Sequence, residues 1–177
     1  MKFRQVSPEV FVATDGVVAI DRGDLAALRA QALTNPSRKA RICAHPSVGD
    51  ALHEMVIVHM SGAYVRPHKH PRKSESFHMI EGRLDIVLFD DVGQVDRVIA
   101  LAADGPGSLF YRLSECRFHT VVPRSDVVVF HEVTNGPFDR SETVFAAWAP
   151  DESDVSGIAQ FASDLEERVS AVRVRTS

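Results

Sequence analysis

Short strand-like runs follow one another through the middle of the chain, and this alternation constrains the fold more than any other feature. The runs are apolar and rich in β-branched residues, and turn residues such as Ser61-Gly62 and Asp104-Gly105-Pro106-Gly107 separate them. Such spacing is typical of an all-β sandwich or barrel. The predicted strands cover residues 53–60, 64–69, 75–80, 84–89, 95–101, 109–113, 117–122, 127–133 and 143–148.

Segments of different character flank the strand-rich part. Asp21 is a good N-cap for a helix that begins near Arg22, and Asn35-Pro36 would end it. Before it, the apolar runs 10–13 and 17–20 around Asp15-Gly16 predict a β-hairpin. After Pro150, apolar residues recur at helical spacing and predict a C-terminal helix; they are Ile158, Phe161, Leu165 and Val169. We therefore expect an N-terminal extension (1–52), a barrel (53–150) and a helical tail (151–177).

Length, charge and cysteine content narrow the class of protein. A chain of 177 residues suits one domain, and its net charge of −4 gives no reason to expect binding to nucleic acid or to an anionic membrane. The first eight residues lack the apolar stretch of a signal peptide, and no apolar run reaches the ~18 residues of a membrane span. Cys43 and Cys116 are too few for a disulfide scaffold. We expect a cytoplasmic protein in which both cysteines are buried thiols, and the sequence leaves their roles open.

The segment from Gly62 to Gly82 carries the chemistry. His68 and His70 stand two residues apart on a predicted strand, so that their side chains point to the same face. Glu75 begins the next predicted strand, and antiparallel pairing would place it beside the two histidines. His119, on a later strand, could complete the set. Imidazole and carboxylate ligands suit one divalent transition metal ion such as Zn, Fe, Mn or Ni. The alternative is that both histidines are solvated in a basic loop.

The pattern of this segment resembles the first motif of the cupin superfamily. Gly62, His68, His70, Glu75 and Gly82 match each fixed position of Gly-x5-His-x-His-x4-Glu-x6-Gly. The second cupin motif is matched clearly by His119 alone, because Ser114, Cys116 and Pro123 stand where Pro, Gly and Asn are expected. The resemblance implies a double-stranded β-helix, the cupin jelly-roll barrel, with a bound metal.

Further segments resemble one subgroup, the WbuC-type cupin metalloproteins of bacterial surface-polysaccharide gene clusters. They include Arg38, Arg41 and His45, the run from Tyr64 to His70, and Phe118-His119-Thr120-Val121. The matching pieces span roughly residues 22 to 152. This resemblance implies a role near polysaccharide or nucleotide-sugar metabolism, with no assigned reaction.

Three further residues are candidates for catalysis or substrate binding at the site. Tyr64 and Arg66 share the strand face of His68, so that Tyr64 could act as an acid and Arg66 could bind a carboxylate or phosphate. Of the neighbours His131 and Glu132 only one can face inward, and we prefer Glu132, as general base or metal-side partner.

The sequence leaves several functions open. A metal-dependent isomerase or epimerase acting on a small polar or sugar-derived molecule is the first hypothesis. A non-haem iron dioxygenase-like enzyme is a second, and a non-catalytic module that binds or senses a small ligand is a third. A homodimer is a reasonable expectation, because symmetric dimers are the commonest oligomers.

Overall fold

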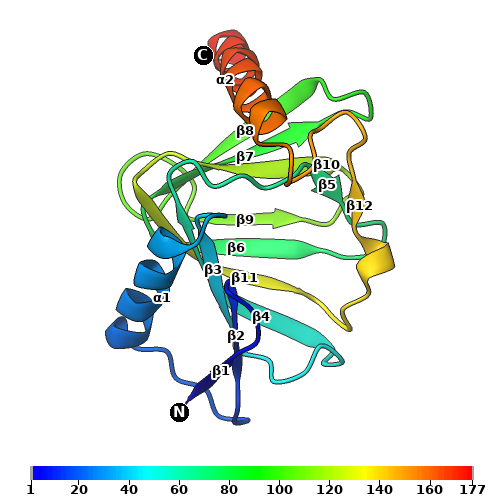
Figure 1. The fold of residues 1–177 in the computed structure, drawn as a ribbon. Helices are drawn as coiled ribbons and strands as arrows, with labels where there is room; N and C mark the ends of the chain where they lie inside the picture. The colour runs from blue at the N-terminus through cyan, green and yellow to red at the C-terminus, as the bar shows by residue number, and fades with distance from the viewer. Residues whose placement is uncertain (1, 177) are drawn as a thin grey trace.

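Two β-sheets face each other and form the body of the molecule (Figure 1). The structure is a computed structural model that describes residues 2–176 of the chain, and the side chains of residues 2–174. The larger sheet contains, in spatial order, β1 (Phe3–Gln5), β2 (Val10–Ala13), β3 (Lys39–Cys43), β4 (Leu52–Met60), β11 (Val127–Asn135), β6 (Glu75–Glu81) and β9 (Phe110–Leu113). The smaller sheet contains β12 (Val144–Phe145), β5 (His68–Lys69), β10 (Phe118–Pro123), β7 (Arg83–Phe89) and β8 (Val95–Ala102).

The strand pairing confirms the predicted fold class, an all-β double-stranded β-helix with an N-terminal helical segment and a C-terminal helix. Nearly all pairs are antiparallel, and consecutive strands pass between the sheets: β6 lies in the larger sheet, β7 and β8 in the smaller, and β9 returns beside β6. The exception is the parallel pair of β2 and β3. Alternation along the strands fills the space between the sheets with apolar side chains, including Phe77, Ile86, Leu101 and Phe130, all buried.

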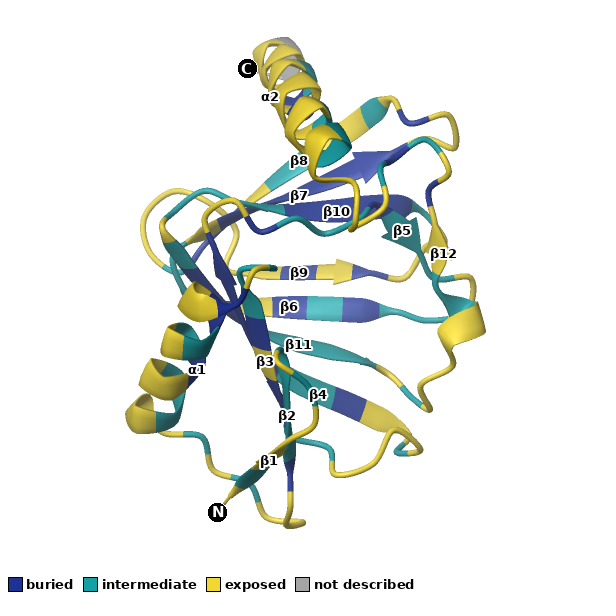
Figure 2. Cartoon of the chain, viewed as in Figure 1, coloured by how far each residue is buried: buried dark blue, intermediate teal, exposed yellow. Residues whose placement is uncertain are grey.

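Helix α1 (Arg22–Thr34) covers the outer face of the larger sheet near β3 and β4 (Figure 1). Its N-terminus has a capping box: Asp21 accepts hydrogen bonds from the backbone of Gly23 and Asp24, and the Asp24 side chain accepts from the Asp21 backbone. Leu28 and Ala32 pack on the outward-facing apolar side chains of the sheet, while the opposite face of the helix is exposed (Figure 2). The helix thus buries one face of β3 and leaves the other for the interior.

Helix α2 (Val155–Thr176) packs on the smaller sheet beside β8. Leu165 and Val169 join an apolar cluster with Phe89 and Phe118. Asp85 is 1% exposed, and its carboxylate accepts hydrogen bonds from Arg124, just after β10, and from Arg173 of α2. Two guanidinium groups on one buried carboxylate fix the helix to the sheet. Neither helix of residues 2–176 is long and apolar enough to cross a membrane.

Two sequence predictions require correction. The hairpin around Asp15-Gly16 does not form, because residues 10–13 pair with β1 and β3, while Ile20 packs into the apolar cluster under α1. The strands predicted over 64–69 and 143–148 shorten to the two-residue strands β5 and β12. β12 is the edge strand of the smaller sheet, and β5 lies between it and β10.

The glycine that closes the metal-binding motif is required by its surroundings. Gly82 has φ +77°, and a Cβ there would overlap the carbonyl oxygen of Val127. Gly105 has a similar φ of +73° with open space around it. We expect Gly105→Ala to lower the free energy of unfolding by about 1 kcal/mol, and Gly82→Ala to lower it by at least about 2 kcal/mol more. Urea unfolding of both variants checks this, and equal losses would contradict the steric argument.

Candidate metal centre

Four side chains from both sheets converge at one end of the barrel. His68 of β5 and His119 of β10 are direct cross-strand partners in the smaller sheet, and His70 follows just after β5. Glu75 begins β6 and reaches the same point from the larger sheet. One ligand atom from each residue lies within 4.8 Å of the other three. The predicted four-residue set is therefore brought together.

One detail of the prediction was wrong. Glu75 was expected on a strand paired with that of His68 and His70, but β6 pairs with β11 and β9 in the opposite sheet. The basic segment between His70 and Glu75 carries the chain from one sheet to the other. The carboxylate therefore faces the imidazoles across the barrel instead of lying beside them.

Backbone carbonyl groups orient all three imidazoles. The Nδ1 atom of His68 lies 2.9 Å from the Arg66 carbonyl oxygen, that of His119 lies 3.0 Å from Arg117, and that of His70 lies 3.1 Å from Glu142. A carbonyl oxygen can only accept, so each Nδ1 carries the proton and donates it. In a neutral ring the lone pair is then on Nε2, which is the arrangement of metal-binding histidines.

The buried polar atoms of the cluster also fit a metal. Glu75 is 5% exposed and His119 is 2% exposed. The Oε1 atom of Glu75 and the Nε2 atom of His119 lie 2.9 Å apart, yet neither makes a hydrogen bond of regular geometry with a described residue. Leaving such atoms without partners is costly, and a cation between them would satisfy both. Three imidazole nitrogens and one carboxylate oxygen suit a divalent transition metal.

The protonation of the cluster follows from its burial and its mixed charges. Burial, together with the neighbouring His119, lowers the pKa of His68 to about 4. Burial opposes ionisation of Glu75, but the three imidazoles outweigh it and lower its pKa. Burial likewise opposes protonation of His119, and the Glu75 carboxylate outweighs it and raises that pKa. At neutral pH the His68 imidazole is neutral and the Glu75 carboxylate is ionised. These are the protonation states that a metal ligand needs.

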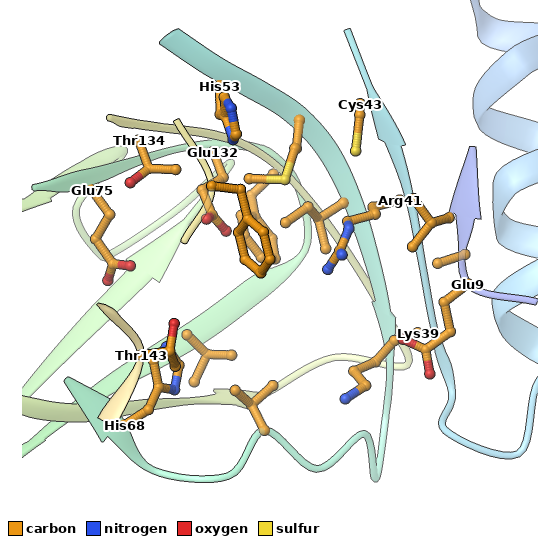
Figure 3. A pocket seen from close by; sticks show the side chains of 18 of the residues that line it. Glu9, Lys39, Arg41, Cys43, His53, His68, Glu75, Glu132, Thr134 and Thr143 are labelled. Carbon is orange, nitrogen blue, oxygen red and sulfur yellow. The ribbon is translucent and has the colours of Figure 1, made fainter. Parts of the chain in front are cut away.

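A cavity of about 760 Å³ opens from the cluster along the inner face of the larger sheet (Figure 3). Apolar side chains such as Met55, Ile57 and Phe130 make up much of its wall. Glu132 faces this cavity from β11, whereas His131 points to the other face and lies 3.7 Å from Glu54. Alternation therefore selects Glu132 as predicted. Burial, with repulsion from Glu75, raises the pKa of Glu132 to about 8.

The other two predicted residues lie differently. Arg66 lines the cavity, and its guanidinium donates to Asp151 at 2.9 Å and stacks on Phe145 at 5.2 Å. Tyr64 is outside the cavity lining, and its hydroxyl donates to the Pro150 carbonyl at 2.9 Å. A side chain engaged in this way supports the wall of the barrel, so we give Tyr64 no part in the chemistry proposed below.

Neither cysteine belongs to the cluster. Cys116 is exposed, and Cys43 is buried at the far side of the cavity, where burial raises its pKa. Both are free thiols. The expectation that both are buried is confirmed for Cys43 and wrong for Cys116.

Sequence reasoning missed three residues at the far end of the cavity. Lys39, Arg41 and His59 line it, on β3 and β4. Arg41 contributes only to the resemblance to WbuC-type cupins, with no predicted role at the site, and only the pairing of Lys39 with His59 brings the three residues together. Strand alternation could have shown that Lys39 and Arg41 share a face, but not that this face is the interior.

Comparison with known proteins gives a family match over part of the chain. Residues 20–101 match a domain of unknown function, DUF6016. A search of curated proteins found no match.

Similar solved structures include CapF with the inhibitor 3-isopropenyl-tropolone (20% identity, TM-score 0.49, 63% of this chain and 32% of that one). A Bacillus subtilis oxalate decarboxylase studied for its Mn(II) centres has 18% identity and a TM-score of 0.43 over 54% of this chain and 24% of that one. The Schizosaccharomyces pombe Cnp3 cupin domain has 11% identity and a TM-score of 0.44 over 55% of this chain and 64% of that one. The chain spans less than two thirds of the length of each, and these similarities concern the fold alone.

The far end of the cavity predicts a pH effect on stability. His59 is 6% exposed, and burial, with Lys39 and Arg41 nearby, lowers its pKa from 6.5 to about 3. Below pH 6.5 His59 binds a proton in the unfolded chain but stays neutral in the folded protein. The free energy of unfolding therefore falls as pH falls. From pH 7 to pH 5 the free energy of unfolding of the metal-free protein should fall by about 2 kcal/mol more than that of His59→Leu.

Urea unfolding at the two pH values measures this difference. His78, on the exposed face of β6, provides the matched control: His78→Leu should lose as much stability as the unsubstituted protein. Equal losses in His59→Leu and the unsubstituted protein would contradict the proposed origin of the acid sensitivity.

Proposed function

We propose that this cupin-fold protein is a metal-dependent enzyme that transfers a proton within a small polar substrate, such as a sugar derivative. The observation that carries the proposal is the set of three Nδ1–carbonyl hydrogen bonds, which direct three Nε2 atoms into the cluster with Glu75. The proton that Glu75 favours on His119 would be displaced by a metal bound there. A role in bacterial surface-polysaccharide or nucleotide-sugar metabolism would fit this chemistry. Divalent Zn, Fe, Mn and Ni all bind histidine and carboxylate ligands of this kind.

His68, His70, Glu75 and His119 would hold the ion. A divalent metal bound there would supply Lewis-acid polarisation of a substrate carbonyl or hydroxyl oxygen. Phe77, Val121 and Phe130 give the neighbouring space an apolar wall. A substrate that fills this space would displace water, which would strengthen its electrostatic interactions with the site.

Glu132 is the group we assign to proton transfer. Thr134 pairs with Glu75, and Glu132 lies two residues along the same strand, so the two carboxylates are diagonal neighbours on one face. Residues in that relation lie roughly 7–8 Å apart, and their Cβ atoms somewhat closer, so a substrate carbon could approach both carboxylates. In the metal-free protein the pKa of Glu132 is raised to about 8. A cation held by Glu75 would lower it, toward the carboxylate form that a general base needs.

Two alternatives differ in their chemistry. An iron-loaded site could support a dioxygenase-like reaction, because open positions beside histidine and carboxylate ligands suit it. A binding module would use the same cavity without turnover. The inward-facing Glu132 favours proton transfer, because a passive ligand site gains nothing from a buried carboxyl group with a raised pKa.

Hydrogen exchange with solvent tests the proposal. The protein is loaded separately with Zn, Mn, Fe or Ni and incubated in D₂O with a panel of nucleotide sugars and sugar phosphates. Proton abstraction by Glu132 and its return should introduce one deuterium into a substrate, a mass increase that mass spectrometry detects. Exchange should depend on the metal and fall by at least about 100-fold in Glu132→Gln, which keeps the shape of the side chain.

The control is metal content, which Glu132→Gln should retain because Glu132 is not one of the four ligands. No exchange with any metal would contradict the proton-transfer proposal. Oxygen consumption by the iron form alone would favour the dioxygenase-like alternative.

A further inference from the structure

The end of the cavity away from the metal centre has three nitrogen-bearing side chains. Lys39 and Arg41 are two residues apart on β3, so both face the cavity, where Lys39 is half-buried and Arg41 is exposed, while Ala40 packs under α1. His59 of β4 is the cross-strand partner of Lys39. Figure 3 shows Arg41 and Lys39 on the opposite side of the cavity from His68 and Glu75.

These groups have donors that protein acceptors do not use. His59 is buried, and its Nδ1 atom has no hydrogen-bond partner among the described residues. Arg41 lies against the Cys43 thiol and, within the part of the chain that the structure describes, forms no ion pair with a carboxylate. Lys39 donates to the Tyr64 carbonyl at 3.0 Å and to Glu152 at 3.1 Å, which leaves one of its three N–H bonds.

The acidic residues nearby do not neutralise this end. Glu152 is 63% exposed, so that its attraction for Lys39 is weakened by solvent. Glu9 lines the cavity but makes no ion pair with Lys39 or Arg41 among the described residues. Glu132 faces the cavity with a raised pKa. The far end therefore presents the positive charge of Lys39 and Arg41 to whatever enters it, with the largely buried His59 ring beside them.

The two ends of the cavity are separated by an apolar stretch. β3 lies three strands from β6, and strands are about 4.8 Å apart, so the two backbones are roughly 14 Å apart. Met55, Ile57 and Phe130 line the interval. A ligand that reaches from the metal centre to Arg41 would need an anionic group separated from its reactive part by a less polar middle.

We propose that Lys39, Arg41 and His59 form a subsite for an anionic group, a carboxylate or a phosphate, of the ligand whose reactive end lies at the metal centre. That the reactive end of this ligand lies at the metal centre rests on the proposed function; the anion subsite itself does not. Arg41 supplies a paired set of N–H donors, Lys39 a point charge, and neutral His59 a hydrogen bond from its ring.

Anion titrations followed by NMR test the subsite. Inorganic phosphate and acetate are added separately to metal-free and Zn-loaded protein, and the His59 ring resonances are followed. We expect at least one of the two anions to shift them saturably, and the one that binds more tightly identifies the class of the group. Arg41→Met should weaken this binding about tenfold or more, Arg41→Lys should restore part of it, and Arg83→Met should leave it unchanged, because Arg83 is exposed outside the cavity.

The two proposals fail in distinguishable ways. Anion binding to the metal-free protein tests the subsite even if no metal is taken up, and zinc content measured on the same samples tests the metal centre. Binding in Arg41→Met as tight as in the unsubstituted protein would overturn the subsite, and so would His59 resonances that neither anion shifts.

Discussion

The orientation of three histidine rings by backbone carbonyl groups is the interaction on which the site depends. A histidine held by its Nδ1–H cannot rotate freely, and its Nε2 lone pair then has a fixed direction. The carbonyls of Arg66 and Arg117 lie two residues before His68 and His119, so the strands themselves orient these two rings. His70 depends instead on Glu142, far away in the sequence. The segment before β12 is therefore part of the metal centre although it contributes no ligand.

The fold joins this centre to a long cavity because the larger sheet continues beyond the barrel. β1, β2 and β3 extend it at one edge, and α1 covers the outer face of that extension. The inner face remains open to the cavity and carries Lys39 and Arg41. An N-terminal segment that resembles a simple support for the barrel thus also shapes its ligand space.

Much of the fold and the ligand set could be predicted from the sequence, and the reasons are local. Alternation with a period of two determines that His68 and His70 point the same way, and that Glu132 faces inward where His131 does not. Asp21 predicts the start of α1 because capping depends on residues within one turn. The strand of Glu75 was predicted to pair with that of His68 and His70, which is wrong. Alternation gives the face to which a side chain points but not the sheet to which the strand belongs. The sequence missed Lys39, Arg41 and His59 for a related reason, since only the pairing of β3 with β4 groups them.

The metal content of the protein, produced without a metal-affinity tag, tests the central claim most directly. Elemental mass spectrometry would compare the unsubstituted protein with His68→Ala and with His78→Ala, which removes an exposed histidine on the outside of the same barrel. The account predicts about one equivalent of a divalent transition metal in the unsubstituted protein and in His78→Ala, and a loss of that metal in His68→Ala. No metal in the unsubstituted protein, and none taken up on reconstitution, would contradict the account.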